Sequence, residues 1–139
     1  MTKEQELAKI MSLIEYYKEQ LQNTELQSQY LQAAITDYYK AQMTLEQMHN
    51  TEKDTDMLIP IGGSTYINVS SKDTSKVLFD IGSGFVAEKS VDDAIKKIGE
   101  RIENLQKNME KLIETSQKLQ NEAAELSQQA QMMMSESKE

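Results

Sequence analysis

The side chains that could carry out catalysis in this chain are few. The chain has one histidine, His49, and no cysteine. A lone histidine cannot build a zinc site, and no thiolate is present to complete one or to act as a nucleophile. His49 falls on a helical apolar seam, so we interpret it as a packing residue. The sequence predicts no metal site and no cofactor.

Two glycine-rich segments have glycines like those of catalytic loops but lack the rest of each motif. Residues 62–64, Gly-Gly-Ser, lack the spacing and the lysine of a phosphate-binding loop. Residues 82–84, Gly-Ser-Gly, are too short for a Gly-x-Ser-x-Gly nucleophile elbow, and no base lies nearby. The carboxylates are spaced along solvated helix faces, where i,i+4 pairing and solubility account for them. We therefore expect that the chain is not an enzyme.

The two ends of the chain indicate a different chemistry, the binding of varied apolar ligands. Met132, Met133 and Met134 are consecutive, and Met11 and Leu13 flank the apolar seam near the N-terminus. Methionine is flexible and polarizable, which suits binding to unrelated apolar groups. Met132 and Met134 lie off the seam, where a monomer has no reason to expose them, so we favour binding. The predicted binding tip consists of Leu7, Ile10, Met11, Leu13, Ile14, Ala130, Met132, Met133 and Met134.

Packing is the competing account of several of these residues. For Ile10, Ile14 and Met133, which lie on the seam, coiled-coil packing and ligand binding remain equal alternatives. The tyrosine pairs at residues 16–17 and 38–39 each place one member on the seam. Packing therefore accounts for the tyrosines better than aromatic recognition does.

Composition restricts the class of protein. The 139 residues are 38% hydrophobic and 6% aromatic and carry a formal net charge of −8, which suits a long, solvated shape. An acidic chain without a basic block lacks the clustered cations that bind phosphate, so we expect no nucleic-acid or membrane partner. No apolar run reaches the roughly 20 residues of a membrane span, and the N-terminus has no signal-peptide core. We expect a soluble, cytoplasmic protein.

Two long helices must position the binding tip. Mostly apolar residues spaced alternately three and four apart form one seam over residues 7–49 and a second over residues 91–133. The middle of the first seam is weak, because Thr24, Ser28 and Gln42 are polar, and the second has one polar position, Ser116. This heptad spacing is typical of a left-handed coiled coil. The predicted helices cover about residues 3–51 and 91–135.

Local signals mark where these helices begin. Thr2 and Gln5 form a capping box, and Ser90 is the N-cap of the second helix. Gly99 lies off the second seam, and a glycine inside a helix lowers its stability by about 1 kcal/mol relative to alanine. A close neighbour that leaves no room for a side chain would explain why glycine occurs there.

The matched lengths of the helices and their compact connector favour an antiparallel hairpin, in which each helix buries its apolar stripe on the other. Both chain ends then lie at the same tip. The alternative is that two chains pair in parallel, helix by helix. The hairpin-like connector favours pairing within one chain.

Between the helices the apolar period changes to two. Residues 57–89 are predicted to form two short β-hairpins that turn at residues 62–63 and 82–84. An isolated two-stranded hairpin is marginal in water, and its edges and apolar faces would be exposed. We expect the hairpins to meet those of other subunits and close into a barrel-like hub of an oligomer. The predicted assembly residues are Ile59, Ile61, Ile67, Val69, Val77, Phe79, Ile81 and Phe85.

The connector also resembles a known family. MLIPIGGSTYI, residues 57–67, and KVLFDIGSGFVAEKS, residues 76–90, are similar to the first- and second-hairpin motifs of prefoldin alpha-type subunits. The order helix, two hairpins, helix extends the resemblance over nearly the whole chain, so residues 1–139 are interpreted as a single prefoldin domain. The archaeal form is the closer likeness, and a eukaryotic alpha-type homologue stays open.

The resemblance implies an ATP-independent chaperone (holdase) subunit. It implies a hexamer of two alpha and four beta subunits, in which the alpha subunits join through their second hairpins and recruit beta subunits through the remaining strands. The coiled-coil tips would hold non-native polypeptides and deliver them to a group II chaperonin. The residues themselves leave open a structural or filament-forming scaffold with the same β hub, and a homo-oligomer.

Overall fold

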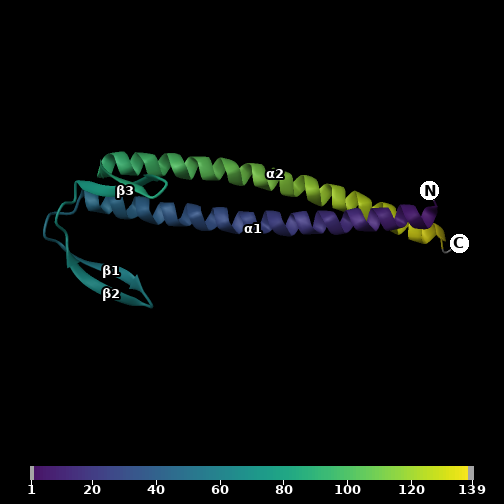
Figure 1. Ribbon diagram of the computed structural model, residues 1–139, viewed down its shortest axis with the longest axis horizontal. Helices are drawn as coiled ribbons and strands as arrows, with labels where there is room; N and C mark the ends of the chain where they lie inside the picture. The colour runs from purple at the N-terminus through teal and green to yellow at the C-terminus, as the bar shows by residue number, and fades with distance from the viewer. Residues whose placement is uncertain (1, 138–139) are drawn as a thin grey trace. The chain divides into compact units, whose positions relative to one another are not determined.

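The computed structural model describes residues 2–137 and consists of two long helices joined by two β-hairpins (Figure 1). The elements are α1 (Lys3–His49), β1 (Asp56–Gly62), β2 (Thr65–Ser70), β3 (Lys76–Gly82), β4 (Phe85–Ser90) and α2 (Val91–Ser137). The predicted fold class, mainly α with two β-hairpins between the helices, is confirmed. The assignment of residues 1–139 to a single domain stays a prediction.

The chain divides into two compact units, which we name by their content. The terminal unit holds α1 up to Ala34 and α2 from Leu105 onward, and the hairpin unit holds Ile35–Asn104. Each unit therefore contains a stretch of both helices, and all four strands belong to the hairpin unit.

Both helices begin at side-chain caps. The Thr2 backbone N–H donates to Gln5 Oε1 at 3.1 Å, and the Gln5 N–H donates to Thr2 Oγ1 at 3.2 Å. At the start of α2 the Asp93 N–H donates to Ser90 Oγ at 3.1 Å. These bonds satisfy first-turn amides that have no acceptor within the helix. The predicted capping box and N-cap are confirmed.

In the terminal unit the two helices run antiparallel. Lys3 Nζ lies 3.4 Å from Glu136 Oε2, and Ser28 Oγ lies 3.5 Å from Met109 Sδ. The facing position on α2 thus moves toward its N-terminus as α1 advances, which identifies an antiparallel pair within one chain. The buried side chains of this unit include Ile14, Thr24 and Ala130, all on the predicted seams.

In the hairpin unit a small core joins α1, β3 and α2, and Figure 1 shows β3 beside these helix ends. Phe79 of β3 is 9% exposed and packs among residues of α2. Its buried neighbours are Ala94, Ile98 and Ile102, and the partly buried rim consists of Tyr38, Ala41, Leu45 and Val77. Ala94 lies off the predicted seam, and its small side chain leaves room for the hairpin to approach the helix.

The two hairpins are separate two-stranded antiparallel sheets with the same construction. Each has a register shift on its first strand just before the turn, as a β-bulge produces. The turn residues have positive φ, +55° at Gly63 and +58° at Ser64, then +53° at Ser83 and +79° at Gly84. Positive φ at both central residues defines the type I′ turn, whose twist matches that of the flanking strands.

Candidate assembly and binding surfaces

Metal-ligating side chains are not clustered in the part of the chain that the structure describes. Residues 2–137 hold no group of three or more His, Cys, Asp or Glu side chains placed to bind a metal ion. Likewise, neither described helix is apolar enough over a sufficient length to cross a membrane.

His49 has a surface position rather than the packing role that its seam position predicted. Its side chain is exposed, and its Nδ1 lies 3.3 Å from Asp92 Oδ1. The packing interpretation was wrong because His49 is the last residue of α1, where the seam ends and the imidazole turns to the first turn of α2.

The predicted binding tip lies entirely in the terminal unit and separates into two sets. The seam residues are covered: Ile14 and Ala130 are buried, and Leu7, Ile10 and Met133 are half-buried. The off-seam residues are exposed, with Met132 at 64%. We name the exposed set the terminal apolar surface, and it consists of Met11, Leu13, Met132 and Met134.

The helix ends that carry this surface are joined to each other. The Lys3–Glu136 ion pair holds the first turn of α1 beside the last turns of α2, so all four residues of the terminal apolar surface come from adjacent helix ends. Coiled-coil packing uses the seam, and these four side chains stay exposed beside it. Ligand binding by the nine tip residues stays a prediction.

In each tyrosine pair the member on the seam is half-buried, as packing predicts, and the other is exposed. Tyr17 is half-buried and Tyr16 exposed, with ring centroids 5.6 Å apart in an edge-on arrangement. A hydrogen bond to the Glu122 side chain, together with burial, raises the pKa of Tyr17 above its usual range. Tyr38 is likewise half-buried and Tyr39 exposed.

Polar seam residues open the helix pair in the middle of the terminal unit. The Thr24 hydroxyl is buried and donates to the Gln20 carbonyl at 2.8 Å, so it is satisfied within its own helix. A groove of about 410 Å³ lies there, and its lining includes Leu21, Thr24, Ser28, Leu112 and Ser116. The weak centre of the seam is therefore a gap in packing, where the Thr24 hydroxyl is paired within its own helix and the Ser28 hydroxyl lies 3.5 Å from Met109 Sδ across the helix pair.

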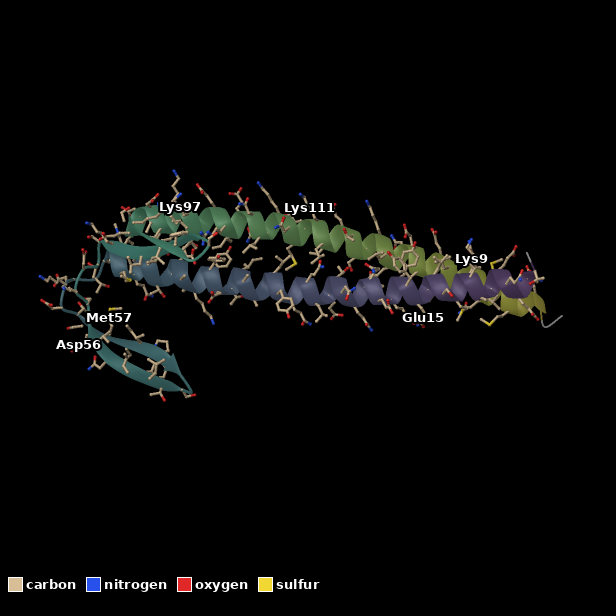
Figure 2. All side chains as sticks on the ribbon, in the orientation of Figure 1. Lys9, Glu15, Asp56, Met57, Lys97 and Lys111 are labelled. Atoms are coloured by element: carbon tan, nitrogen blue, oxygen red, sulfur yellow. The ribbon has the colours of Figure 1, made fainter. Side chains whose placement is uncertain are left out.

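The first hairpin, β1–β2, exposes apolar side chains on both faces. Leu58, 68% exposed, and Tyr66 lie on one face, and Ile59 and Ile67 lie on the other. Ile61, at the register shift, is also exposed. Figure 2 labels Asp56 and Met57 at its base. No charged residue occurs between Asp56 and Lys72. A sheet of two strands whose only charged residue is Asp56 at its base, with apolar side chains exposed on both faces, is marginal in water when it is alone.

The second hairpin, β3–β4, has one face covered by its own helices. Phe79 is buried and Val77 and Ala87 are half-buried on that face, whereas Leu78 (76% exposed) and Val86 lie on the outer face. Only the outer face and the turn are left for a partner.

The structure thus divides the eight predicted assembly residues. Val77 and Phe79 pack within the chain itself, Val69 is half-buried, and the exposed ones are Ile59, Ile61, Ile67, Ile81 and Phe85. Sequence reasoning missed four exposed apolar residues of the opposite faces, Leu58, Tyr66, Leu78 and Val86. The signal that could have found them is in the pattern, since apolar residues occupy both alternating positions of these strands.

Comparisons with known proteins agree with this arrangement. Residues 17–136 match the family model Prefoldin, described as prefoldin subunit. The prefoldin subunit alpha of Archaeoglobus fulgidus is 28% identical over 108 residues, which cover 78% of this chain and 79% of that protein. That of Methanococcoides burtonii is 30% identical over 99 residues, 69% of this chain and 72% of that protein.

Two solved structures share the fold. One is filamentous PFD from Methanocaldococcus jannaschii, with a TM-score of 0.59 and 21% identity over 88% of this chain and 96% of that one. The other is the prefoldin beta subunit from Thermococcus strain KS-1, with a TM-score of 0.60 and 21% identity over 91% of this chain and 90% of that one.

Proposed function

The chain belongs to the prefoldin family, a family of non-enzymatic chaperones, and from that premise we propose that it is the alpha-type subunit of an ATP-independent holdase. It works in the cytoplasm, captures non-native polypeptides at the terminal apolar surface and delivers them to a group II chaperonin. The observation that carries this proposal is the exposure of Met11, Leu13 and Met132 off the seam, beside the paired helix ends.

The capture chemistry is apolar burial without a fixed shape. Burial of apolar surface contributes roughly 25 cal/mol per Å², so each methionine supplies a modest, adaptable contact. Several subunits that present such a surface together would bind one unfolded chain at many points, which raises the overall affinity without requiring a specific sequence. The net charge of −8 keeps a protein with exposed apolar groups soluble.

The hairpins supply the assembly that brings several such surfaces together. We assign the exposed faces of both hairpins to contacts with a second alpha subunit and with beta-type subunits, in a hexamer of two alpha and four beta chains. Support comes from the first hairpin, which has no charged residue after Asp56 and whose two apolar faces need cover, and from the exposed outer face of the second.

A substitution set in the assembled complex tests capture. Met11, Leu13, Met132 and Met134 are all changed to serine, and light scattering follows aggregation of a refolding client. The proposal predicts loss of aggregation suppression. The matched control changes three exposed apolar residues of the terminal unit outside the surface, Leu26, Tyr30 and Ile113, to serine. Full suppression by the first variant would refute the capture role.

The competing function is a structural or filament-forming scaffold built on the same hub, and one of the similar structures is a filament. A pure scaffold assembles but does not suppress aggregation, so the wild-type complex in the same assay separates the two functions. The hub has its own test: aspartate at Ile81 and Phe85 should release smaller species in sedimentation, and an unchanged mass would exclude assembly through the second hairpin.

A further inference from the structure

Arg101, the only arginine in the chain, connects three elements of the hairpin unit. From α2, its Nη2 donates to the backbone carbonyl of Asp80 on β3 at 2.9 Å, and its Nη1 donates to the Tyr38 hydroxyl on α1 at 3.4 Å. The guanidinium carbon lies 4.5 Å from the centroid of the Phe79 ring and 5.8 Å from that of Tyr38. One side chain thus covers the buried aromatic of β3 and anchors its backbone.

These contacts use properties that a lysine does not have. A guanidinium is planar, so its face can stack on an aromatic ring while its edge donates to two oxygens in different directions. An ammonium group is a single nitrogen on a flexible stem and can occupy only one of these positions well. The arrangement around Arg101 therefore depends on the shape of the cation as well as on its charge.

A second hydrogen bond fixes β3 between the residue that Arg101 contacts and the turn. The Gly82 N–H donates to Asp80 Oδ1 at 2.8 Å, so the residue anchored by Arg101 through its carbonyl also fixes the bulge through its carboxylate. The exposed residues that follow, Ile81 and Phe85, and those of the outer face, Leu78 and Val86, are carried by this anchored backbone.

We propose that Arg101 is a positioning residue for assembly, which locks β3–β4 onto the helices so that Leu78, Val86 and the turn face a partner subunit in a fixed orientation. This role rests on the proposed assembly through the hairpins and adds the residue that sets the pose of one of them. A pre-positioned hairpin binds without a further ordering cost, whereas a loose one has to be ordered by its partner. Arg101 touches no partner itself in this scheme.

Hydrogen exchange of the full-length single chain tests the lock directly. In Arg101→Lys and Arg101→Gln, we expect the β3–β4 amides to exchange about tenfold faster, as loss of a charge-assisted hydrogen bond predicts, because an undocked two-stranded hairpin opens readily. The β1–β2 amides serve as an internal reference and should change by less than about twofold. The control Lys96→Gln removes one exposed positive charge of α2 and should change neither hairpin.

The same variants mixed with a beta-type subunit test the role in assembly. We expect native mass spectrometry to show smaller species for both Arg101 variants and the full complex for wild type and Lys96→Gln. Wild-type exchange in Arg101→Lys would overturn the inference, because charge alone would then suffice. Faster exchange with an unchanged complex would also overturn it, because the pose would then not matter. Failure of the proposed assembly itself would appear in the wild type, as an absence of complex, and would remove the positioning role with it.

Discussion

The two hairpins have the same strand lengths, the same bulge position and the same turn type, but they are covered differently. Ile59 and Phe79 occupy equivalent positions, paired with Ile67 and Ala87 respectively. Ile59 is 42% exposed, whereas Phe79 is buried against α2. Local sequence rules therefore build both hairpins, and contacts outside the hairpin decide which one docks on the helices and which one stays exposed.

The neighbouring position shows the same difference. Asp80 of the second hairpin offers a carbonyl to Arg101 and a carboxylate to the bulge. Its counterpart in the first hairpin, Pro60, has no side-chain acceptor and no backbone N–H. The docked hairpin thus combines a large buried apolar residue, Phe79, with a polar anchor at Asp80, and the first hairpin has neither.

The largest effect should come from removing the docked aromatic. Phe79→Ala leaves a cavity beside Ala94 and should lower the free energy of unfolding of the single chain by about 3 kcal/mol. Its positional match Ile59→Ala removes side-chain atoms that are in water and should change that free energy by less than about 0.5 kcal/mol. Urea unfolding measures both changes. Equal losses of unfolding free energy would show that the two hairpins are docked to the same extent.

Charge placed on the first hairpin should give the next largest effect, and only in the complex. Ile59→Asp with Ile67→Asp would bury carboxylates under a partner, which costs about 3 kcal/mol or more and prevents assembly. The unfolding free energy of the single chain should be unchanged, because both side chains are exposed there. Asn121→Asp adds a charge at an exposed position of the terminal unit, which holds no strand, and is the control. Sedimentation of mixtures with a beta-type subunit provides the readout, and normal assembly of the double variant would show that this face stays uncovered.

A smaller effect, a gain in stability, is expected from a substitution in α2, the helix on which the second hairpin docks. A Cβ at Gly99 would lie 3.4 Å from Gln42 Nε2, the end of a flexible side chain and an ordinary contact distance. Gln42 is the close neighbour that the sequence left unnamed. Gly99→Ala should therefore stabilise α2 by up to about 1 kcal/mol through helix propensity. Thermal unfolding tests this, and a lower midpoint would mean that the helices cannot yield at this point.

The smallest effect concerns the segment between the hairpins. Asp73 Oδ1 accepts hydrogen bonds from the Ser75 N–H at 2.8 Å and the Ser75 hydroxyl at 2.6 Å, and these bonds lower the pKa of Asp73 below its ordinary value of 3.8. A lowered pKa means that the bonds contribute fully above that ordinary value and are lost as pH falls through the folded-state pKa. The Ser75 amide NMR shift should therefore be constant from pH 7 to about 5 and titrate only at lower pH. Asp73→Asn should abolish this titration, and a wild-type titration above the ordinary pKa would contradict the assignment.

The sequence predicts the elements well because their signals are local. Capping at Thr2 and Ser90, heptad spacing and the change of period after Met57 each depend on residues within a few positions. The exposed methionines could also be predicted, since Met132 and Met134 depart from a seam that the sequence defines.

The docking of one hairpin could not be predicted in the same way. Ile59 and Phe79 are both apolar residues at the same place in similar strands, and the difference between them depends on Ala94 and Arg101 of the helix that follows the second hairpin. Neither residue breaks the heptad pattern or carries a motif. Physical contact between elements far apart in sequence supplies this information, and periodicity does not contain it.

Amide exchange of the wild-type chain, alone and in complex with a beta-type subunit, tests the central claim most directly. The account predicts that in the single chain β3–β4 exchanges more slowly than β1–β2, because only β3–β4 has a face covered by helices. On complex formation, the β1–β2 amides should slow the most. Equal exchange of the two hairpins in the single chain, or first-hairpin amides that stay fast in the complex, would contradict it.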